Sequence, residues 1–147
     1  MTKDDNRTNG GRFEQELAEI LAKRGFWVHV MQQNKAGQPA DIIAVKGRFH
    51  TLIDCKLISD DSGFPFKRVE ENQRSAMRRF TNRGNELCYF AIKAMVNGQW
   101  EIRMVSLGRI ETLEHRGRRQ LSMRDLANEA WSLEKWLDAS DTWGEDV

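Results

Sequence analysis

The run Leu52-Ile53-Asp54-Cys55-Lys56 constrains the fold of this chain more than any other segment. It is apolar enough to form a central strand, yet it carries two charged residues at its end. Strand side chains alternate between the faces of a sheet, so Asp54 and Lys56 point the same way, roughly 6.6 Å apart along the strand. A charge at the end of a buried strand needs a partner or a function. The segment therefore predicts a central strand that ends in a polar site.

Hydrophobic periodicity places this strand in one α/β domain. Helical spacing predicts helices over residues 11–24, 68–83 and 122–137, and short apolar runs predict strands over 26–31, 40–45, 49–56, 87–94 and 99–107. The expected order is α-β-β-β-α-β-β-α, with a mixed central sheet flanked by helices. We expect a flexible N-terminal arm over residues 1–10, the domain over 11–140 and an acidic tail over 141–147.

The bulk composition narrows the classes of protein. The chain has 147 residues, of which 39% are hydrophobic and 31% charged, and this is typical of a folded soluble domain. No apolar run approaches the roughly 18–20 residues that cross a membrane, and we expect no membrane partner. The cysteines Cys55 and Cys88 have no metal-type or disulfide-type spacing, so a cytoplasmic location is expected. An acidic end after residue 133 leaves a basic body, which is compatible with a polyanionic partner.

A second carboxylate is expected beside Asp54. Asp41 opens the preceding strand, and a hairpin turn at Lys46-Gly47-Arg48 brings the two strands together, so both aspartates can sit at one end of the sheet. Two carboxylates that converge with Lys56 form a site for a hard divalent cation such as Mg²⁺. Such an ion activates water and neutralises charge on a phosphate, and phosphodiester hydrolysis requires both. The alternative is a solvated strand end with an ion pair worth about 0–1 kcal/mol.

Gln73 is a polar residue on an otherwise apolar helical stripe. The stripe of the second predicted helix comprises Val69, Ala76, Met77 and Phe80, and Gln73 falls near its middle. A buried amide costs roughly 1–3 kcal/mol unless it is hydrogen-bonded. It can bind a strand carbonyl as a structural partner, or it can bind a site carboxylate or metal-bound water.

The residues of this site resemble the signature of the PD-(D/E)XK nuclease superfamily, in Gly-Gln-Pro-Ala-Asp41 and then Leu-Ile-Asp54-Cys-Lys56. Upstream, Gly11-Arg-Phe-Glu14-Gln-Glu-Leu is similar to the first-helix glutamate motif of Holliday junction resolvases. Downstream, Phe64-Pro65-Phe66 and Asn72-Gln73 are similar to elements of the RecU-type resolvases. The resemblance covers about residues 9–92. Asp54 stands where the RecU-type pattern usually has glutamate.

The resemblance implies a restriction-endonuclease-like core and a homodimeric endonuclease, dependent on Mg²⁺ or Mn²⁺, that resolves four-way DNA junctions in recombination or repair. The compact chain suggests a phage origin. The implied metal ligands are Asp41, Asp54 and Glu14, and the implied catalytic set adds Lys56 and Gln73. Helical geometry barely separates Glu14 from Glu16, and the motif favours Glu14. Two other functions stay open: a nuclease of this superfamily that cuts flaps, ends or restriction-type sites, and a DNA-binding module without turnover.

Two surface features complete the sequence pattern. Basic residues on and before the second helix and in the loop near residue 117 are candidate phosphate contacts, with a solvated surface as the alternative. These are Lys67, Arg68, Arg74, Arg78, Arg116, Arg118 and Arg119. The last predicted helix carries one apolar stripe, which covers the sheet or a second copy of the chain: Leu126, Ala130, Leu133, Trp136 and Leu137.

Overall fold

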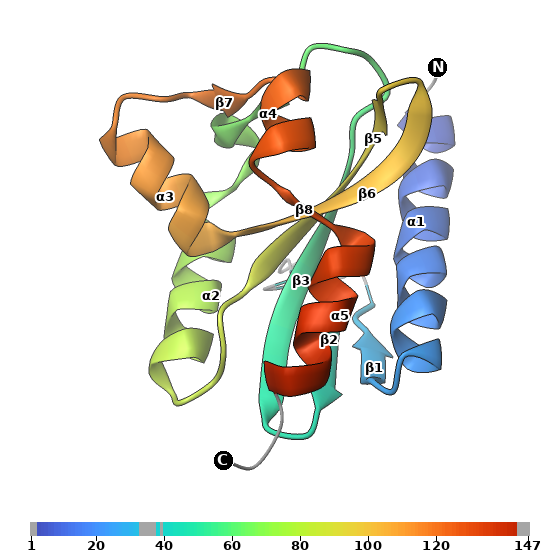
Figure 1. The fold of residues 1–147 in the computed structure, drawn as a ribbon, viewed down its shortest axis with the longest axis vertical. Coiled ribbons are helices and arrows are strands. Elements are labelled where there is room, and N and C mark those ends of the chain that lie inside the picture. The colour runs from blue at the N-terminus through green and yellow to red at the C-terminus, as the bar shows by residue number, and fades with distance from the viewer. Residues whose placement is uncertain (1–2, 33–37, 39, 144–147) are drawn as a thin grey trace.

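A computed structural model describes residues 3–32, 38 and 40–143 of the chain, with side chains from residue 11 onward (Figure 1). In chain order, the elements are α1 (Lys3–Lys23), β1 (Trp27–Val30), β2 (Ile42–Lys46), β3 (Phe49–Leu57), β4 (Phe64–Pro65), the 3-10 turn η1 (Phe66–Arg68), α2 (Glu71–Asn82), β5 (Tyr89–Val96), β6 (Gln99–Ser106), α3 (Leu107–His115), β7 (Gln120–Leu121), α4 (Met123–Asn128), β8 (Trp131–Ser132) and α5 (Leu133–Trp143).

The main sheet has six strands in the order β1-β2-β3-β5-β6-β8. Strands β1, β2 and β3 form an antiparallel meander, whereas β3 and β5 are parallel because α2 lies in the connection between them. Strands β5 and β6 form a hairpin whose turn residues Asn97 and Gly98 have φ angles of 52° and 81°. Positive φ at both positions is what a tight two-residue hairpin turn requires. The predicted mixed sheet flanked by helices is confirmed.

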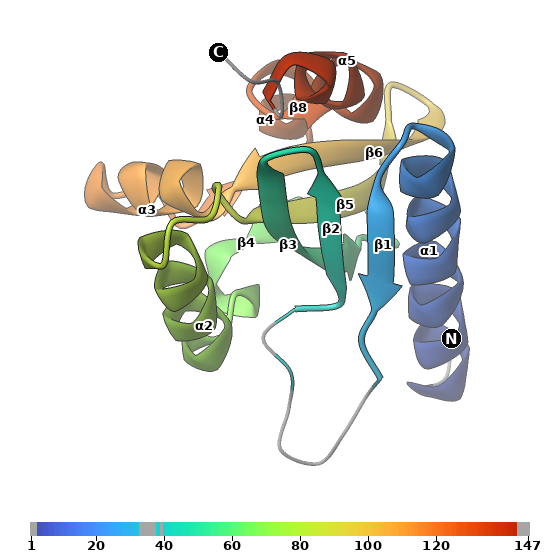
Figure 2. The same ribbon diagram turned by 90° about the horizontal axis from the view of Figure 1, so that it is seen from below.

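Helices cover both faces of this sheet, with α1 and α2 on opposite sides of β2 and β3 (Figures 1 and 2). The core beneath α1 and α5 contains Leu17, Ile53 and Trp136. Trp136 is fully buried, and its ring centroid lies 5.4 Å from that of Tyr89. The core beneath α2, α3 and α4 comprises side chains such as Leu52, Phe66, Met77, Ile110 and Leu126. The successive residues Leu52 and Ile53 thus enter different cores, as strand alternation requires.

The single C-terminal helix predicted over residues 122–137 is wrong. Ser122 caps the N-terminus of α4 with the expected capping box, in which the side chains of Ser122 and Asp125 accept each other's backbone N–H, but this helix ends at Asn128. Strand β8 then pairs with the edge of β6, and α5 follows. Leu126 lies in one core and Trp136 in the other, so the apparent stripe belongs to two helices on opposite faces of the sheet.

Three other differences concern α3, a small second sheet and the start of α1. The sequence pattern did not predict α3, nor the two-stranded sheet in which Phe64 pairs with Leu121. Two-residue strands are too short to carry an alternating pattern. Helix α1 begins at Lys3 rather than at Gly11, so most of the predicted N-terminal arm is helical. Extending a helix costs far less than starting one, so a polar segment can continue the helix that Phe13 and Leu17 anchor.

Among the described residues, no helix is both long enough and apolar enough to span a membrane.

Candidate active site

The pairing of β2 with β3 brings Asp41 next to Asp54. Ile42 pairs with Ile53, and the backbone N–H of Asp41 donates to the carbonyl of Ile53 at 3.1 Å, so the two aspartates flank this last pair. Asp41 is only 7% exposed, and its Oδ2 accepts a hydrogen bond of 2.7 Å from the backbone N–H of Cys55. The charge of Asp41 raises the pKa of Asp54, as expected for two carboxyl groups that lie near each other. They therefore share one position at the end of the sheet.

Asp54 and Lys56 face α2, where Gln73 joins them. Lys56 Nζ lies 3.0 Å from Asp54 Oδ2, and the Gln73 amide Nε2 donates to Asp54 Oδ1 at 3.0 Å. Lys56 Nζ also donates to Gln73 Oε1 at 3.5 Å. The capping box of α2 fixes Gln73 in the first turn of the helix, because its Oε1 accepts the backbone N–H of Glu70 at 3.4 Å. Of the two alternatives for this amide, the structure shows the contact with a site carboxylate.

Glu14 supplies a third carboxyl group from α1. Its pKa is raised to about 7, first by burial and then by the charge and hydrogen bond of Asp41, with a smaller contribution from Asp54. Glu16 points elsewhere, and its carboxylate accepts a hydrogen bond of 2.5 Å from Lys93 Nζ. Of the two neighbouring glutamates, only Glu14 therefore faces the aspartates.

The electrostatics of the cluster are those of carboxylates crowded into a buried place. Burial and the charge of Asp41 raise the pKa of Asp54 to about 7, although Lys56 acts in the opposite direction. Burial, followed by the charges of Asp41 and Asp54, also raises the pKa of the Cys55 thiol well above its ordinary value. A single lysine does not neutralise this group, so at neutral pH the site favours binding a further positive charge, either protons or a cation.

The side chains present fit a hard cation by chemical type, since carboxylate and amide oxygens are the ligands that Mg²⁺ prefers. Asp54 Oδ2 is buried and, despite the nearby ammonium group, accepts no hydrogen bond of acceptable geometry from any described residue. Within the described part of the chain, no three acidic, histidine or cysteine side chains already surround one point as a complete ligand set. Further ligands would therefore come from water and phosphate oxygens.

Residues 5–143 of the chain match the family described as archaeal Holliday junction resolvase (Hjc). The chain belongs to this family. The function shown by this membership is that of a Holliday junction resolvase, a metal-dependent endonuclease of DNA recombination and repair. The motifs also resembled the RecU type, but the match is to the archaeal family, and neither the RecU type nor a phage origin finds support.

A solved structure shares the fold of this Hjc-family chain. It is Hjc from Archaeoglobus fulgidus, a Holliday junction resolvase from an archaeal hyperthermophile. The TM-score is 0.58 at 19% sequence identity, with 88% of this chain and 96% of that chain covered. The similarity shows the restriction-endonuclease-like arrangement of a mixed sheet and its helices. A comparison with curated proteins gives no match.

Three of the predicted phosphate contacts of this Hjc-family chain are engaged in ion pairs. Arg74 donates two hydrogen bonds to the Glu114 carboxylate, at 2.6 and 3.0 Å. Arg78 pairs with Glu111, and Arg118 pairs with an acidic residue of α4. A phosphate would have to compete with these carboxylates, so the three arginines are weaker candidates than their sequence positions indicated.

The other four predicted contacts lie near the turn η1 and the loop after α3. Lys67, Arg116 and Arg119 are exposed, and Arg68 is half-buried. The backbone N–H of Phe66 donates to the carbonyl of Arg119 at 2.9 Å, which holds this basic loop against η1. Among the described residues, none of the four forms a salt bridge, so their role as phosphate contacts stays a prediction.

The sequence reasoning missed one polar side chain beside the site. The Gln38 amide Nε2 donates to Asp41 Oδ1 at 3.1 Å, so this aspartate is held from both of its oxygens. Gln38 stands three residues before Asp41, inside the motif used to identify that aspartate. An amide three residues before a predicted site carboxylate was the available signal.

Proposed function

We propose that this chain cuts four-way DNA junctions by metal-assisted hydrolysis at the cluster of Asp41, Asp54 and Glu14, with Lys56 and Gln73 completing the catalytic set. The carboxylates would hold Mg²⁺ or Mn²⁺. The observation that carries the proposal is that Asp54 on β3, Asp41 just before β2 and Glu14 on α1 lie near one another beside the ammonium group of Lys56. Such a set supplies ligands for a hard cation and a positive charge for a phosphate.

The protein's own residues have distinct tasks in this mechanism. When bound, the cation would act as a Lewis acid on a phosphoryl oxygen and lower the pKa of a bound water. Lys56 Nζ, held by Asp54 and Gln73, is a preorganised positive charge for the oxygen on which negative charge develops, or for orienting the attacking water. Gln73 fixes the positions of both charged groups through one amide. Gln38 and the Cys55 backbone N–H orient Asp41.

Cation affinity is expected to fall by about 10–100-fold between pH 8 and pH 6, because carboxylates must lose their protons to bind a metal. The pKa values of Glu14 and Asp54 are raised to about 7 from their ordinary values of 4.5 and 3.8. Isothermal titration with Mn²⁺ at several pH values measures the effect. Affinity that does not change over this range would contradict the assignment of these two ligands.

The raised pKa values of Glu14 and Asp54 also determine how the stability of the metal-free protein changes with pH. A carboxyl group with a raised folded-state pKa stabilises the fold while it is protonated, and this contribution is lost as pH rises through about 7. The metal-free protein should therefore melt at a lower temperature at pH 8 than at pH 6. Added Mg²⁺ should raise the melting temperature more at pH 8, which differential scanning fluorimetry can follow.

A homodimer is part of the proposal, because a junction is resolved by symmetrical cuts in two opposing strands, and the described part of one copy carries one such cluster. End-labelled four-way junction, plain duplex and flap DNA, each with Mg²⁺ or EDTA, test the function. We expect paired nicks in the junction only with Mg²⁺. Equal cleavage of flaps would indicate a nuclease of broader specificity, and junction binding without cleavage would indicate a DNA-binding module.

A further inference from the structure

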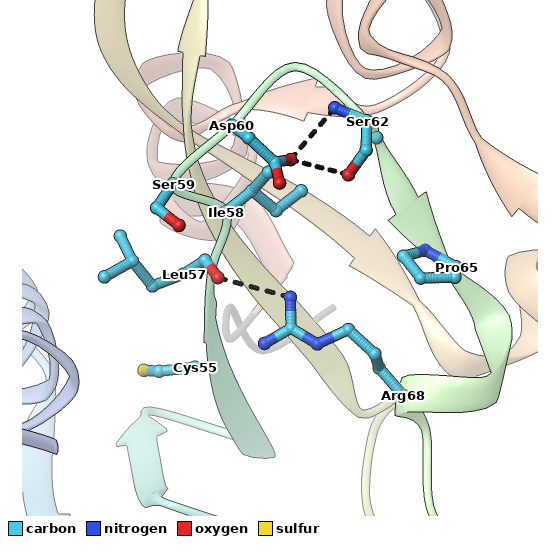
Figure 3. A pocket seen from close by; sticks show the side chains of 9 residues that line it. Cys55, Leu57, Ile58, Ser59, Asp60, Ser62, Pro65 and Arg68 are labelled. Atoms are coloured by element: carbon cyan, nitrogen blue, oxygen red, sulfur yellow. Dashed lines mark hydrogen bonds between the residues drawn. The ribbon is translucent and has the colours of Figure 1, made fainter. Parts of the chain in front are cut away.

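A pocket of about 440 Å³ opens beside the catalytic cluster, between the end of β3 and the turn η1 (Figure 3). Cys55, Leu57 and Ile58 line it from β3 and the residue after it, and Arg68 lines it from η1. Figure 3 shows the guanidinium group of Arg68 reaching across the pocket toward the backbone of Leu57. Arg68 is thus the group that brings a formal positive charge into this space.

Arg68 is a half-buried cation that has no anionic partner among the described residues. Its Nη1 donates to the carbonyl of Leu57 at 3.2 Å, and the guanidinium carbon lies 5.8 Å from the centroid of the Phe64 ring. No described carboxylate forms a salt bridge with it, in contrast to Arg74 in the same part of the fold. Burial lowers the pKa of Arg68, which reflects the cost of removing its charge from water without compensation. Such a group is suited to receive an anion.

Asp60, the acidic residue at the rim of the pocket, is not the anionic partner of Arg68. The Asp60 carboxylate is turned toward its own loop, where Oδ1 accepts hydrogen bonds from the backbone N–H and the hydroxyl of Ser62 at 3.0 and 2.6 Å (Figure 3). These two bonds also lower the pKa of Asp60. Its carboxylate is exposed and screened by water, so it leaves most of the guanidinium donors of Arg68 available.

The position of Arg68 relative to the cluster defines what the anion would be. Leu57, which Arg68 contacts, directly follows Lys56 on β3. The pairing of β2 ends at Ile53, so no described strand covers this edge of β3 from Asp54 onward. The charge of Asp54 acts on Arg68, which places the two groups in one electrostatic environment. A DNA strand with one phosphate at Lys56 can therefore continue along this open edge toward Arg68.

We propose that Arg68 binds the DNA phosphate adjacent to the scissile one, so that this pocket is a second phosphate subsite of the active site. The assignment rests on the proposed function. A planar guanidinium fork matches two phosphate oxygens, and the Phe64 ring and the Leu57 carbonyl hold it ready in the orientation required. This contact fixes the register of the strand, and hence which phosphate reaches the cation.

The experiment combines a protein change with a DNA change. Four-way junctions are prepared with one neutral methylphosphonate in place of each phosphate flanking the scissile bond, and kcat/KM is measured for the wild type and Arg68→Gln. We expect each single change, in the protein or at one flanking position, to lower kcat/KM by about 10–100-fold, as for the loss of a charged hydrogen bond. The two changes together should cost little more than one, because they remove the same contact.

Two further variants make the result decisive. Arg68→Lys keeps the charge but not the fork, and it should recover only part of the activity on the unmodified junction. Arg109→Gln removes the same charge from an exposed position on α3 and should leave cleavage unchanged. Additive losses at every flanking phosphate would overturn the subsite, even if Arg68→Gln is less stable, because a structural role does not depend on a particular DNA phosphate. Failure of the wild type to cut any junction would overturn the proposed function instead.

Discussion

Asp54→Ala is expected to reduce metal-dependent junction cleavage by at least about 1000-fold while the protein still folds and binds DNA. Asp54 is 3% exposed and lies between Lys56 and Gln73, next to Asp41, so its loss removes a proposed cation ligand and releases the ammonium group of Lys56. Single-turnover kinetics on a labelled four-way junction measure the cleavage. Electrophoretic mobility shifts in EDTA measure the binding.

The fold is expected to tolerate this change. The raised pKa of Asp54 means that its ionised form destabilises the native state above about pH 7, so removal of the carboxylate also removes a cost. Asp54→Asn provides a variant of the same shape, and it should retain the wild-type circular dichroism spectrum. Asp61→Ala, at an exposed position on the loop after β3, is the matched control and should cut normally. Cleavage by both Asp54 variants at the wild-type rate would refute the site.

Lys56→Gln is expected to lower kcat by about 100–1000-fold, the effect of losing one preorganised charge that stabilises a transition state. Lys56 also counteracts the raised pKa of Asp54. The variant should therefore bind Mn²⁺ with its affinity shifted to higher pH, because the remaining carboxylates hold their protons more strongly. Stopped reactions with saturating junction give kcat, and isothermal titration across pH gives the second effect.

The control for this variant is Lys135→Gln, an exposed position on α5 away from the cluster. An unchanged kcat, with any effect confined to KM, would show that Lys56 has no part in the chemical step. Loss of cation binding at every pH would instead assign Lys56 a structural task in holding Asp54. The two readouts therefore separate a role in catalysis from a role in positioning.

The central part of the fold was predictable because it depends on local patterns. Alternation placed Asp54 and Lys56 on one face of β3, and the hairpin turn after Lys46 set the register that brings Asp41 alongside. Both inferences need only strand geometry and a turn. The site motif could therefore be located before any tertiary contact was known, although its catalytic roles stay predictions.

The C-terminal third was not predictable in the same way. Leu126 and Trp136 lie at helical spacing, yet they occupy cores on opposite faces of the sheet, because β8 takes the chain past the edge of β6. Hydrophobic periodicity indicates which residues of a helix are buried, but it does not indicate against which face of a sheet they pack. A helical stripe therefore cannot distinguish one long helix from two short ones that cross an edge.

The sequence by itself determined the kinds of side chain in the cluster, the strand that presents Asp54 and Lys56, and the order of the central elements. Only the tertiary structure decided that Gln73 bonds a carboxylate, that Arg74 is bound by Glu114, and that Arg68 has no anionic partner among the described residues. Spacing along the sequence determines on which face of its own helix or strand a side chain lies. The partner it meets depends on contacts between residues distant in sequence, whose geometry no short pattern encodes.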